Sequence, residues 1–290
     1  MERFCVITNQ DKDENFVMAR YIADYLEKHR CSCCILDNQK EMEHGVRHFT
    51  RAAEIPPETQ CALVLGGDGT MIQAAIDLVH LNIPILGINM GTVGFLTEVE
   101  RQNLNHALER LLSDDYTIES RIMLKETTRC ATSDSDTPVS CYALNDVVIS
   151  KRGSCRLITI EVFINEELAD IYRADGLIVS TPTGSTGYNL SAGGPVMVPH
   201  THATVITPIC AHSLNKRSLV VSAKDKITLR IGRTKEAQED TAVLVVDGRN
   251  VGEFVTGDQL DVCVPEDMTH LIKLSDISFY KRMREKLNGN

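Results

Sequence analysis

The sequence has no long hydrophobic run. Nowhere in its 290 residues is there a stretch of about 18 uncharged apolar residues, the length that a membrane-spanning helix requires. The first apolar segment, Phe4-Cys5-Val6-Ile7, has the pattern of a strand and not the layout of a signal peptide. These absences predict a cytoplasmic protein.

Clustered positive charge is also absent. No block of five or more Lys and Arg residues occurs, and the formal net charge is −10. Proteins that bind DNA or RNA neutralise the phosphate backbone with basic side chains, and proteins that lie on membranes often carry a basic amphipathic helix. We therefore expect no nucleic-acid partner and no membrane partner, and a small-molecule ligand instead.

The ten cysteines lack the spacing of a metal site. Cys31-Ser32-Cys33-Cys34 contains one Cys-x-x-Cys pair, but a zinc site would need a second pair. Cys33-Cys34-Ile35-Leu36 has the pattern of a strand, whereas a redox pair would open a helix. Because Cys5, Cys61 and Cys263 lie in apolar runs, we predict reduced, buried, structural thiols and no metal held by protein ligands.

The order of apolar patterns indicates two domains. Over about the first 115 residues, short apolar runs alternate with segments of helical spacing, which is typical of an α/β domain with a parallel sheet. Short β-branched runs with Gly and Asp between them then predict a mostly-β domain. We place the α/β domain at residues 1–120 plus 271–290 and the all-β domain at residues 121–270. The C-terminal helix, with Ile277 and Tyr280 on its apolar face, should return to pack on the N-terminal domain.

The most informative motif is Gly66-Gly67-Asp68-Gly69-Thr70, which ends the apolar run Leu63-Val64-Leu65. A buried strand, a glycine turn and a helix start together place backbone N–H groups where they can contact phosphate. Asp68 would repel a phosphate unless it acts as a base toward a hydroxyl group or helps to hold a metal ion. The motif matches neither G-x-G-x-x-G nor G-x-x-x-x-G-K-[ST], and a plain turn is the alternative interpretation.

Four further stretches hold small and polar residues where a core would need apolar ones. Residues 87–96 contain three glycines and Phe95, which either covers a ligand ring or fills the core. Asn145-Asp146 interrupts an apolar run, so at least one polar side chain would be buried. A contact with a ligand or a hairpin turn would provide its hydrogen-bond partners. Residues 173–195 run from a strand into a loop of glycines and hydroxyl groups, some of which could only cap a short helix. Asp247-Gly248 has the pattern of a hairpin turn.

Taken in this order, the motifs resemble those of the NAD kinase family. The Gly-Gly-Asp-Gly element is also shared with phosphofructokinases and lipid kinases, whereas Thr-Pro-Thr-Gly-Ser-Thr and Ser-Ala-Gly-Gly-Pro are similar to NAD kinases in particular. The stretches that carry the resemblance are Gly66–Thr70, Gly91–Phe95, Asn145-Asp146, Arg173–Gly176, Thr181–Tyr188, Ser191–Pro195 and Thr207–Leu214. The resemblance implies transfer of the γ-phosphoryl group of ATP, or alternatively of polyphosphate, to the 2′-hydroxyl of the adenosine ribose of NAD, giving NADP.

The resemblance also implies roles for individual residues. Asp68 matches the proton acceptor for that 2′-hydroxyl, and the backbone of Gly67, Gly69 and Thr70 matches the part that handles phosphates. Mg²⁺ would arrive with ATP, and the implied assembly is a homodimer or homotetramer. The remaining substrate-contacting candidates are Phe95, Asn145, Asp146, Arg156, Arg173, Asp175, Thr183, Thr186, Gly187, Tyr188, Asn189, Leu190, Ser191 and Arg249.

Four positions depart from the usual family pattern. Asp146 stands where Glu is usual and Gly187 where Ala is usual, and both changes could alter affinity for the dinucleotide. Ala211 replaces a Pro. Arg249 stands where Gln often follows Asp-Gly, which could alter a preference at a phosphate.

Three other functions remain as alternatives. A non-catalytic NAD(P) sensor would keep the dinucleotide site without turnover, and a kinase of the same superfold would act on a sugar or lipid hydroxyl. A Rossmann oxidoreductase ranks last, because Thr8-Asn9-Gln10-Asp11 stands where its glycine fingerprint would follow the first strand.

Overall fold

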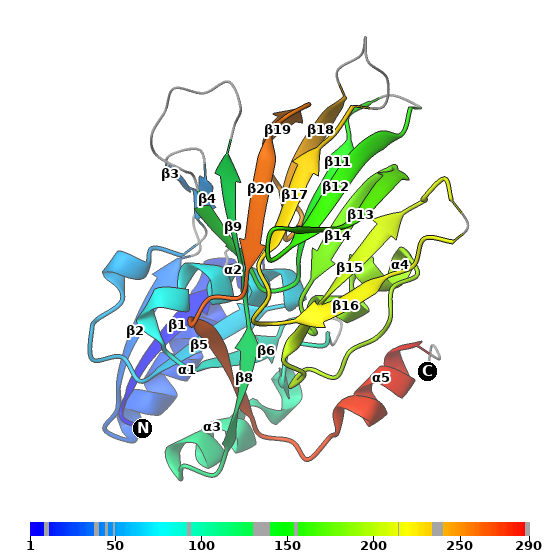
Figure 1. Cartoon of the computed structure of the whole chain (residues 1–290). Helices are drawn as coiled ribbons and strands as arrows, with labels where there is room; N and C mark the ends of the chain where they lie inside the picture. Colours follow the sequence, from blue (N-terminus) through cyan, green and yellow to red (C-terminus); the bar gives the residue numbers. More distant parts are fainter. Residues whose placement is uncertain are drawn as a thin grey trace. The chain divides into compact units, whose positions relative to one another are not determined.

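The computed structural model describes residues 1–8, 12–37, 41–43, 46–48, 50–91, 94–129, 140–153, 156–213, 215–233 and 240–287. The chain divides into two compact units (Figure 1). Unit 1 consists of Met1–Arg121 and Asp267–Asn290, and unit 2 consists of Ile122–Glu266.

Unit 1 is built on a mostly parallel sheet of seven strands. These strands are β1 (Arg3–Thr8), β2 (Ser32–Asp37), β5 (Cys61–Gly66), β6 (Ile85–Asn89), β7 (Val99–Glu100), β8 (Thr117–Ile122) and β21 (Met268–Lys273). Their order is β2-β1-β5-β6-β21-β8, with β7 paired to β6. Strands β1, β2, β5 and β6 pair in parallel, which confirms the predicted α/β class. A separate pair joins β3 (Glu41–Glu43) to β4 (Val46–His48).

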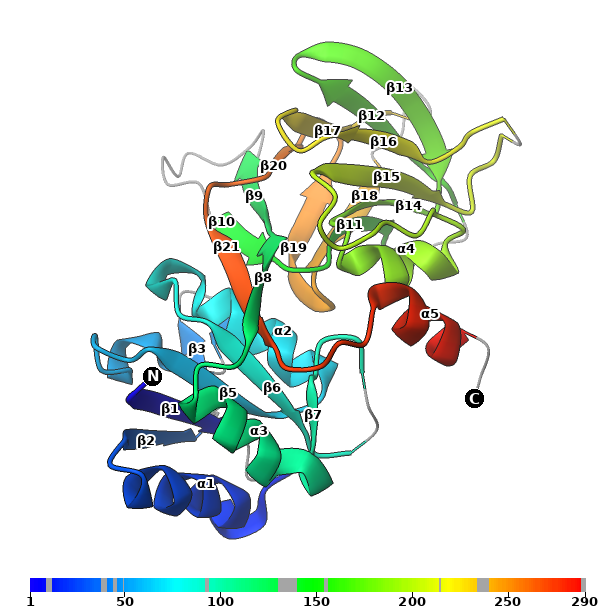
Figure 2. The same cartoon turned by 90° about the horizontal axis from the view of Figure 1, so that it is seen from below.

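Helices cover both faces of this sheet. They are α1 (Val17–Lys28), α2 (Asp68–Asp77) and α3 (Leu104–Leu112). Unit 1 also contains the C-terminal helix α5 (Phe279–Leu287) and the short 3-10 turns η1 (Glu14–Phe16), η2 (Ala52–Glu54), η3 (Val79–Leu81) and η4 (Arg101–Asn103). Figure 2 shows α1 and α3 on the same side of the sheet, where Ile22 and Leu108 share one apolar core with Leu63. Helix α2 packs on the opposite face, where the Met71 sulfur approaches Gly87. Apolar side chains at helical spacing thus hold α1, α2 and α3 to the strands.

The strand order creates a switch point in unit 1. From β1 the chain passes through α1 to β2 on one side, and β5 lies on the other side of β1. In open α/β sheets, ligands bind outside the carboxyl ends of the strands at such a point. The segments that leave these two strand ends contain Lys12 and the Gly67-Asp68 turn.

Helix α5 belongs to unit 1, so the predicted return of the C-terminal helix is confirmed. Two residues of its expected apolar face, Ile277 and Tyr280, are 40% and 62% exposed, whereas Met283 is half-buried. Arg282 of the same helix makes polar contacts with residues 95–98. Periodicity located this helix, but it could not indicate these polar contacts.

Unit 2 contains two six-stranded antiparallel sheets, ordered β10-β9-β20-β17-β12-β13 and β16-β15-β14-β11-β18-β19. The strands of the first are β9 (Leu124–Arg129), β10 (Ser140–Ala143), β12 (Ile158–Ile164), β13 (Glu167–Ala174), β17 (Ile227–Ile231) and β20 (Gln259–Cys263). Those of the second are β11 (Asp146–Lys151), β14 (Gly176–Ser180), β15 (Ala203–Ile209), β16 (Leu219–Ser222), β18 (Thr241–Val246) and β19 (Arg249–Val255). A short helical segment, η5 (Gly184–Thr186) followed by α4 (Tyr188–Ser191), interrupts the strands where the short helix was predicted.

The Asn145-Asp146 pair lies neither inside a continuous strand nor in a hairpin turn. The run from Ala143 is not one strand, and the pair does not form a hairpin turn, because β10 and β11 pair in different sheets. The chain bends at Leu144-Asn145 and crosses from one sheet to the other. Asp146 is the first residue of β11 and is buried.

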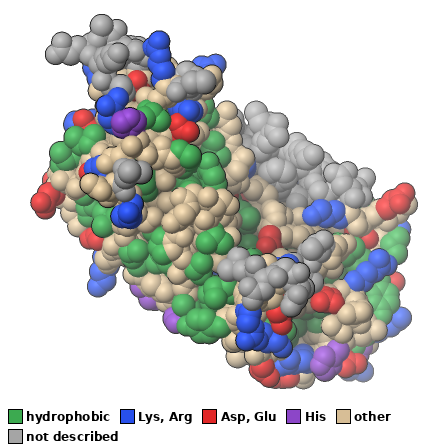
Figure 3. All heavy atoms as spheres, turned by 90° about the vertical axis from the view of Figure 1, so that its right-hand side faces the viewer, with side chains coloured by type: hydrophobic (Ala, Val, Ile, Leu, Met, Phe, Trp, Pro, Cys, Tyr) green, Lys and Arg blue, Asp and Glu red, His purple; other side chains and the backbone are tan. Residues whose placement is uncertain are grey.

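The cysteines within the described residues are free thiols. Cys5 and Cys61 are buried as expected, but Cys263 is exposed, because it ends its strand. No helix among the described residues is long and apolar enough to span a membrane. On the face drawn in Figure 3, acidic and basic side chains are interspersed, unlike the basic stripe of a nucleic-acid-binding protein.

Candidate active site

The glycine turn of unit 1 has the predicted geometry. Strand β5 ends at Gly66, Gly67 occupies the N-cap position, and Asp68 is the first residue of α2. A Cβ on Gly66 would lie 2.3 Å from the Thr70 hydroxyl oxygen, so this position requires glycine. The start of a helix combines unpaired N–H donors with a favourable dipole, which is the local chemistry of an anion site.

The Asp68 carboxylate faces the segment that follows β6. The Phe95 N–H donates to Oδ2 at 2.7 Å and the Leu96 N–H donates to Oδ1 at 3.0 Å. A Cβ on Gly94 would lie only 1.8 Å from Oδ1, so only glycine lets the backbone pass this close to the carboxylate. The two glycine motifs predicted separately from the sequence therefore meet at one carboxylate.

Lys12 brings a cation to the same turn. Its ammonium nitrogen is 3.7 Å from the position that a Cβ on Gly67 would occupy, and the residue is exposed. Lys12 is not among the residues predicted from the sequence. Its position in the loop after the first strand could have indicated it, because that loop and the Gly67-Asp68 turn lie on the two sides of the switch point.

A hollow of about 630 Å³ lies at the carboxyl end of β6, lined by Asn89, Met90, Gly91, Glu100, Arg101 and Gln102. The Asn89 side chain shapes its rim, because it donates to the Gly91 carbonyl (2.8 Å) and accepts from the Gly91 N–H (3.0 Å). Phe95 is half-buried, which fits either of the two roles expected for it.

In unit 2 the Asn145-Asp146 bend is held by Asp247. The Asp247 carboxylate accepts hydrogen bonds from the N–H groups of Leu144 (2.7 Å), Asn145 (2.9 Å) and Asp146 (2.8 Å). Asp247 and Gly248 have φ angles of 45° and 76°, as a tight hairpin turn between β18 and β19 requires. The predicted turn is confirmed, but the turn pattern did not indicate this contact with the bend.

The two aspartates of this bend have raised pKa values. Desolvation, followed by the nearby Asp247 charge, raises the pKa of Asp146 to about 7. Desolvation also raises the pKa of Asp247 to about 6, although the three backbone donors and Arg249 oppose this shift. Two carboxyl groups therefore titrate near neutral pH at one candidate ligand-contacting bend.

The loop after β14 is attached to this bend. The Asn145 carbonyl accepts from the Thr181 N–H (2.9 Å) and the Ser180 hydroxyl (3.2 Å). A Cβ on Gly184 would lie 2.2 Å from that carbonyl, so the loop needs glycine there. The structure thus brings Asn145 and Asp146 together with the Thr183–Ser191 candidates.

Within this loop, scaffold and accessible residues can be told apart. The Ser185 hydroxyl donates to the Pro182 carbonyl, and Thr186 donates to the Thr183 carbonyl, so these hydroxyls do not cap the helix. Asn189 is fully buried, with its amide bonded to the carbonyls of Ser185 and Pro195 and to the Thr207 hydroxyl. The exposed candidates are Gly187, Tyr188 and Ser191, whereas Thr183, Thr186 and Leu190 are half-buried.

Three other candidates lie elsewhere in unit 2. Asp175 precedes β14, and Thr181 follows it, so these residues are separated by the length of the strand, roughly 20 Å. Asp175 pairs with Lys151 at 2.6 Å, and Arg173 is the last residue but one of β13. Arg156 is exposed just before β12. By contrast, Arg249 follows the Asp247 turn and lies near the Asn145-Asp146 bend.

Comparisons with known proteins identify the family of this chain. A family profile described as the ATP-NAD kinase N-terminal domain matches residues 4–116, and one described as the ATP-NAD kinase C-terminal domain matches residues 144–274. This chain belongs to the ATP-NAD kinase family. NAD kinases from Lachnoclostridium phytofermentans and Lachnospira eligens are 42% and 38% identical to it, each over 99% of this chain and over 99% and 100% of their own lengths. The family assignment made from the sequence motifs is confirmed.

Solved structures support the fold of this family member. The crystal structure of yeast NADH kinase complexed with NADH has a TM-score of 0.79 at 21% identity and covers 100% of this chain and 88% of that one. An NAD kinase from Archaeoglobus fulgidus in complex with ATP has a TM-score of 0.69 at 23% identity, with coverages of 99% and 97%. The predicted two-part fold is therefore confirmed.

Proposed function

We propose that this chain transfers the γ-phosphoryl group of ATP to the 2′-hydroxyl of the adenosine ribose of NAD, with Asp68 as the proton acceptor. The observation that carries the proposal is the placement of one carboxylate at a glycine turn and helix start, in a chain of the NAD kinase family. A ribose hydroxyl is a poor nucleophile while it keeps its proton, and a carboxylate within hydrogen-bond reach can accept that proton as the bond to phosphorus forms.

The Asp68 carboxylate is suited to this role by its hydrogen bonds. An ionised carboxylate can accept about four hydrogen bonds, and the backbone of Phe95 and Leu96 uses one position on each oxygen. One further position on each oxygen can accept the substrate hydroxyl. The two N–H groups fix the orientation of the carboxylate, so that little reorganisation is needed when the substrate binds.

Mg²⁺ is proposed to enter with ATP. The described residues contain no group of three or more His, Cys, Asp and Glu side chains arranged to hold a metal ion. This fits a cation carried by substrate phosphates with one or two protein carboxylates, which is the usual mode for Mg²⁺. When bound, Mg²⁺ would neutralise phosphate charge, and Asp68 is the carboxylate at the turn that could contact it.

Unit 2 is proposed to supply the residues that contact the nucleoside. Asn145 and Asp146 offer an amide and a carboxyl group at the bend, and Tyr188 and Ser191 offer an aromatic ring and a hydroxyl group in the loop attached to it. This set suits a nucleoside with its ribose. Arg249 adds a cation next to the bend. A homodimer or homotetramer and a cytoplasmic location stay predictions from the sequence.

Lys12 is proposed to contact the phosphates of ATP, because its ammonium lies against the glycine turn. Removing its charge in Lys12→Met should raise the KM for ATP by about tenfold, the size of one charge-assisted hydrogen bond, and leave the KM for NAD within about twofold. Lys28→Met, at the exposed end of α1, is the matched control and should change neither constant. An unchanged KM for ATP in Lys12→Met would contradict this role.

The activity itself is tested by NADP formation from NAD and ATP with Mg²⁺, read through an NADP-specific dehydrogenase. We expect turnover that EDTA abolishes and excess Mg²⁺ restores. If NAD binds but no NADP forms with ATP or polyphosphate, the sensor alternative replaces the kinase proposal.

A further inference from the structure

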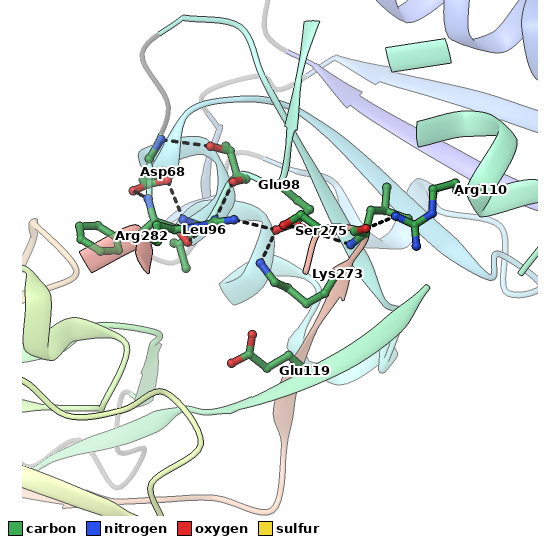
Figure 4. Close-up of polar contacts among 12 residues, drawn as sticks. Asp68, Leu96, Glu98, Arg110, Glu119, Lys273, Ser275 and Arg282 are labelled. Atoms are coloured by element: carbon green, nitrogen blue, oxygen red, sulfur yellow. Dashed lines mark hydrogen bonds and ion pairs between the residues drawn. The ribbon is translucent and has the colours of Figure 1, made fainter. Parts of the chain in front are cut away.

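Arg282 of α5 contacts the same backbone segment that holds Asp68 (Figure 4). Its Nη1 donates to the carbonyls of Phe95 (3.2 Å) and Thr97 (3.1 Å). The Phe95 carbonyl and the Leu96 N–H belong to one peptide group, and this N–H donates to Asp68. A cation, a peptide dipole and a carboxylate therefore form one continuous chain of hydrogen bonds.

Glu98 fixes the guanidinium in this position. Arg282 Nη2 donates to Glu98 Oε2 at 3.1 Å, and the Glu98 side chain is only 1% exposed. Glu98 also pairs with Lys273 and accepts from the Ser275 N–H (2.7 Å) and hydroxyl (2.6 Å). Although desolvation opposes it, the neighbouring Lys273 holds the pKa of Glu98 below its ordinary value, so the carboxylate stays charged.

We propose that Arg282 is a positioning residue for the reaction: it holds the Phe95–Leu96 peptide group in the orientation that fixes and polarises the Asp68 carboxylate. The inference rests on the proposed role of Asp68. Arg282 does not touch the substrate in this scheme; it acts through the peptide. Consecutive hydrogen bonds of this kind strengthen one another. The planar fork of Arg holds its donors in a fixed geometry toward two carbonyls and a carboxylate, whereas the ammonium of Lys is a point charge on a flexible stem.

The test is a set of variants at Arg282. Arg282→Met should lower kcat by about tenfold and leave both KM values within about twofold, because an interaction that serves the reacting group is lost while substrate binding is kept. Arg282→Lys should retain part of the activity, and added guanidinium should restore part of it in Arg282→Ala. Arg284→Met, an exposed arginine on the same helix, should match the wild type.

A double-mutant cycle separates positioning from general stabilisation. In the Asp68→Asn background, Arg282→Met should cause no further loss of kcat, because the two residues act as one unit. An equal fold-loss in both backgrounds, or an unchanged kcat in Arg282→Met, would overturn the proposal.

Amide hydrogen exchange provides a readout that needs no turnover. The Phe95 and Leu96 amides should exchange faster in Arg282→Met than in the wild type or in Arg284→Met. Unchanged exchange rates would overturn the proposal that Arg282 holds the Phe95–Leu96 peptide group, even if the kinase activity is present. Faster exchange in a protein that makes no NADP would support this hold on the peptide group and contradict only the proposed reaction.

Discussion

Replacing Asp68 with asparagine is expected to lower kcat for NADP formation by about 10²- to 10⁴-fold, the range for removal of a general base. Asparagine has nearly the same shape but cannot accept the ribose proton. Dissociation constants for NAD should change little, because the asparagine carbonyl can still accept the ribose hydroxyl and the other proposed nucleoside-contacting residues lie in unit 2.

The side effects of this substitution can be predicted from the hydrogen bonds of the carboxylate. Asparagine offers one acceptor oxygen, so it can keep only one of the two bonds from Phe95 and Leu96. Some loosening of the segment should therefore accompany the loss of the base, and amide exchange at these two residues measures it.

Asp24→Asn, an exposed aspartate of α1, is the control for the loss of one negative charge and should keep wild-type kcat. Turnover of Asp68→Asn within threefold of the wild type would rule out Asp68 as the base. A loss of NAD binding as large as the loss of turnover would instead indicate that Asp68 serves mainly to bind substrate.

Local chemistry explains why the glycine turn could be predicted. An apolar run, three glycines and a helical pattern leave few alternatives to a strand, a tight turn and a helix start, and the structure has all three at Cys61–Gly66 and Asp68–Asp77. The alternation of patterns likewise indicated the parallel sheet, because a buried parallel strand reads as a continuous apolar run.

Contacts between distant polar residues could not be predicted in this way. Arg282 and Phe95 are 187 residues apart, and no periodic pattern links an arginine on a helix to a backbone carbonyl. The bend at Asn145 was missed for a related reason: residues 143–150 read as one strand, and only the pairing of the two halves in different sheets shows the break. The Asp247-Gly248 turn was predicted, but its carboxylate serves a bend about 100 residues earlier.

The second large effect is expected at that carboxylate. Asp247→Ala would leave the N–H groups of Leu144, Asn145 and Asp146 without their acceptor. An unsatisfied buried donor costs about 1–3 kcal/mol, so we expect a loss of about 3 kcal/mol or more in the free energy of unfolding, visible as a fall in Tm of roughly 6–12 °C. Because the bend carries Asn145 and Asp146, the KM for NAD should rise more than kcat falls.

Asp225→Asn is the matched control, since Asp225 also accepts a backbone N–H, from Ser222, at a turn of unit 2. It should cost less stability and leave the KM for NAD unchanged. A stable Asp247→Ala protein with wild-type KM for NAD would show that the bend holds its shape without this carboxylate.

The pH dependence of stability provides an independent check on the Asp146–Asp247 pair. Their folded pKa values, about 7 and about 6, lie above the ordinary value of an unfolded aspartate, near 3.9. Between about pH 4 and pH 7 the folded protein therefore binds more protons at this pair than the unfolded chain does, and the stability that the pair contributes falls as pH rises. The Asp247→Asn substitution removes one titrating group and its repulsion of Asp146. The free energies of unfolding measured with urea at pH 5 and pH 7 should therefore differ less in this variant than in the wild type. An equal or larger difference in the variant would mean that these two carboxyl groups do not control the pH dependence in this range.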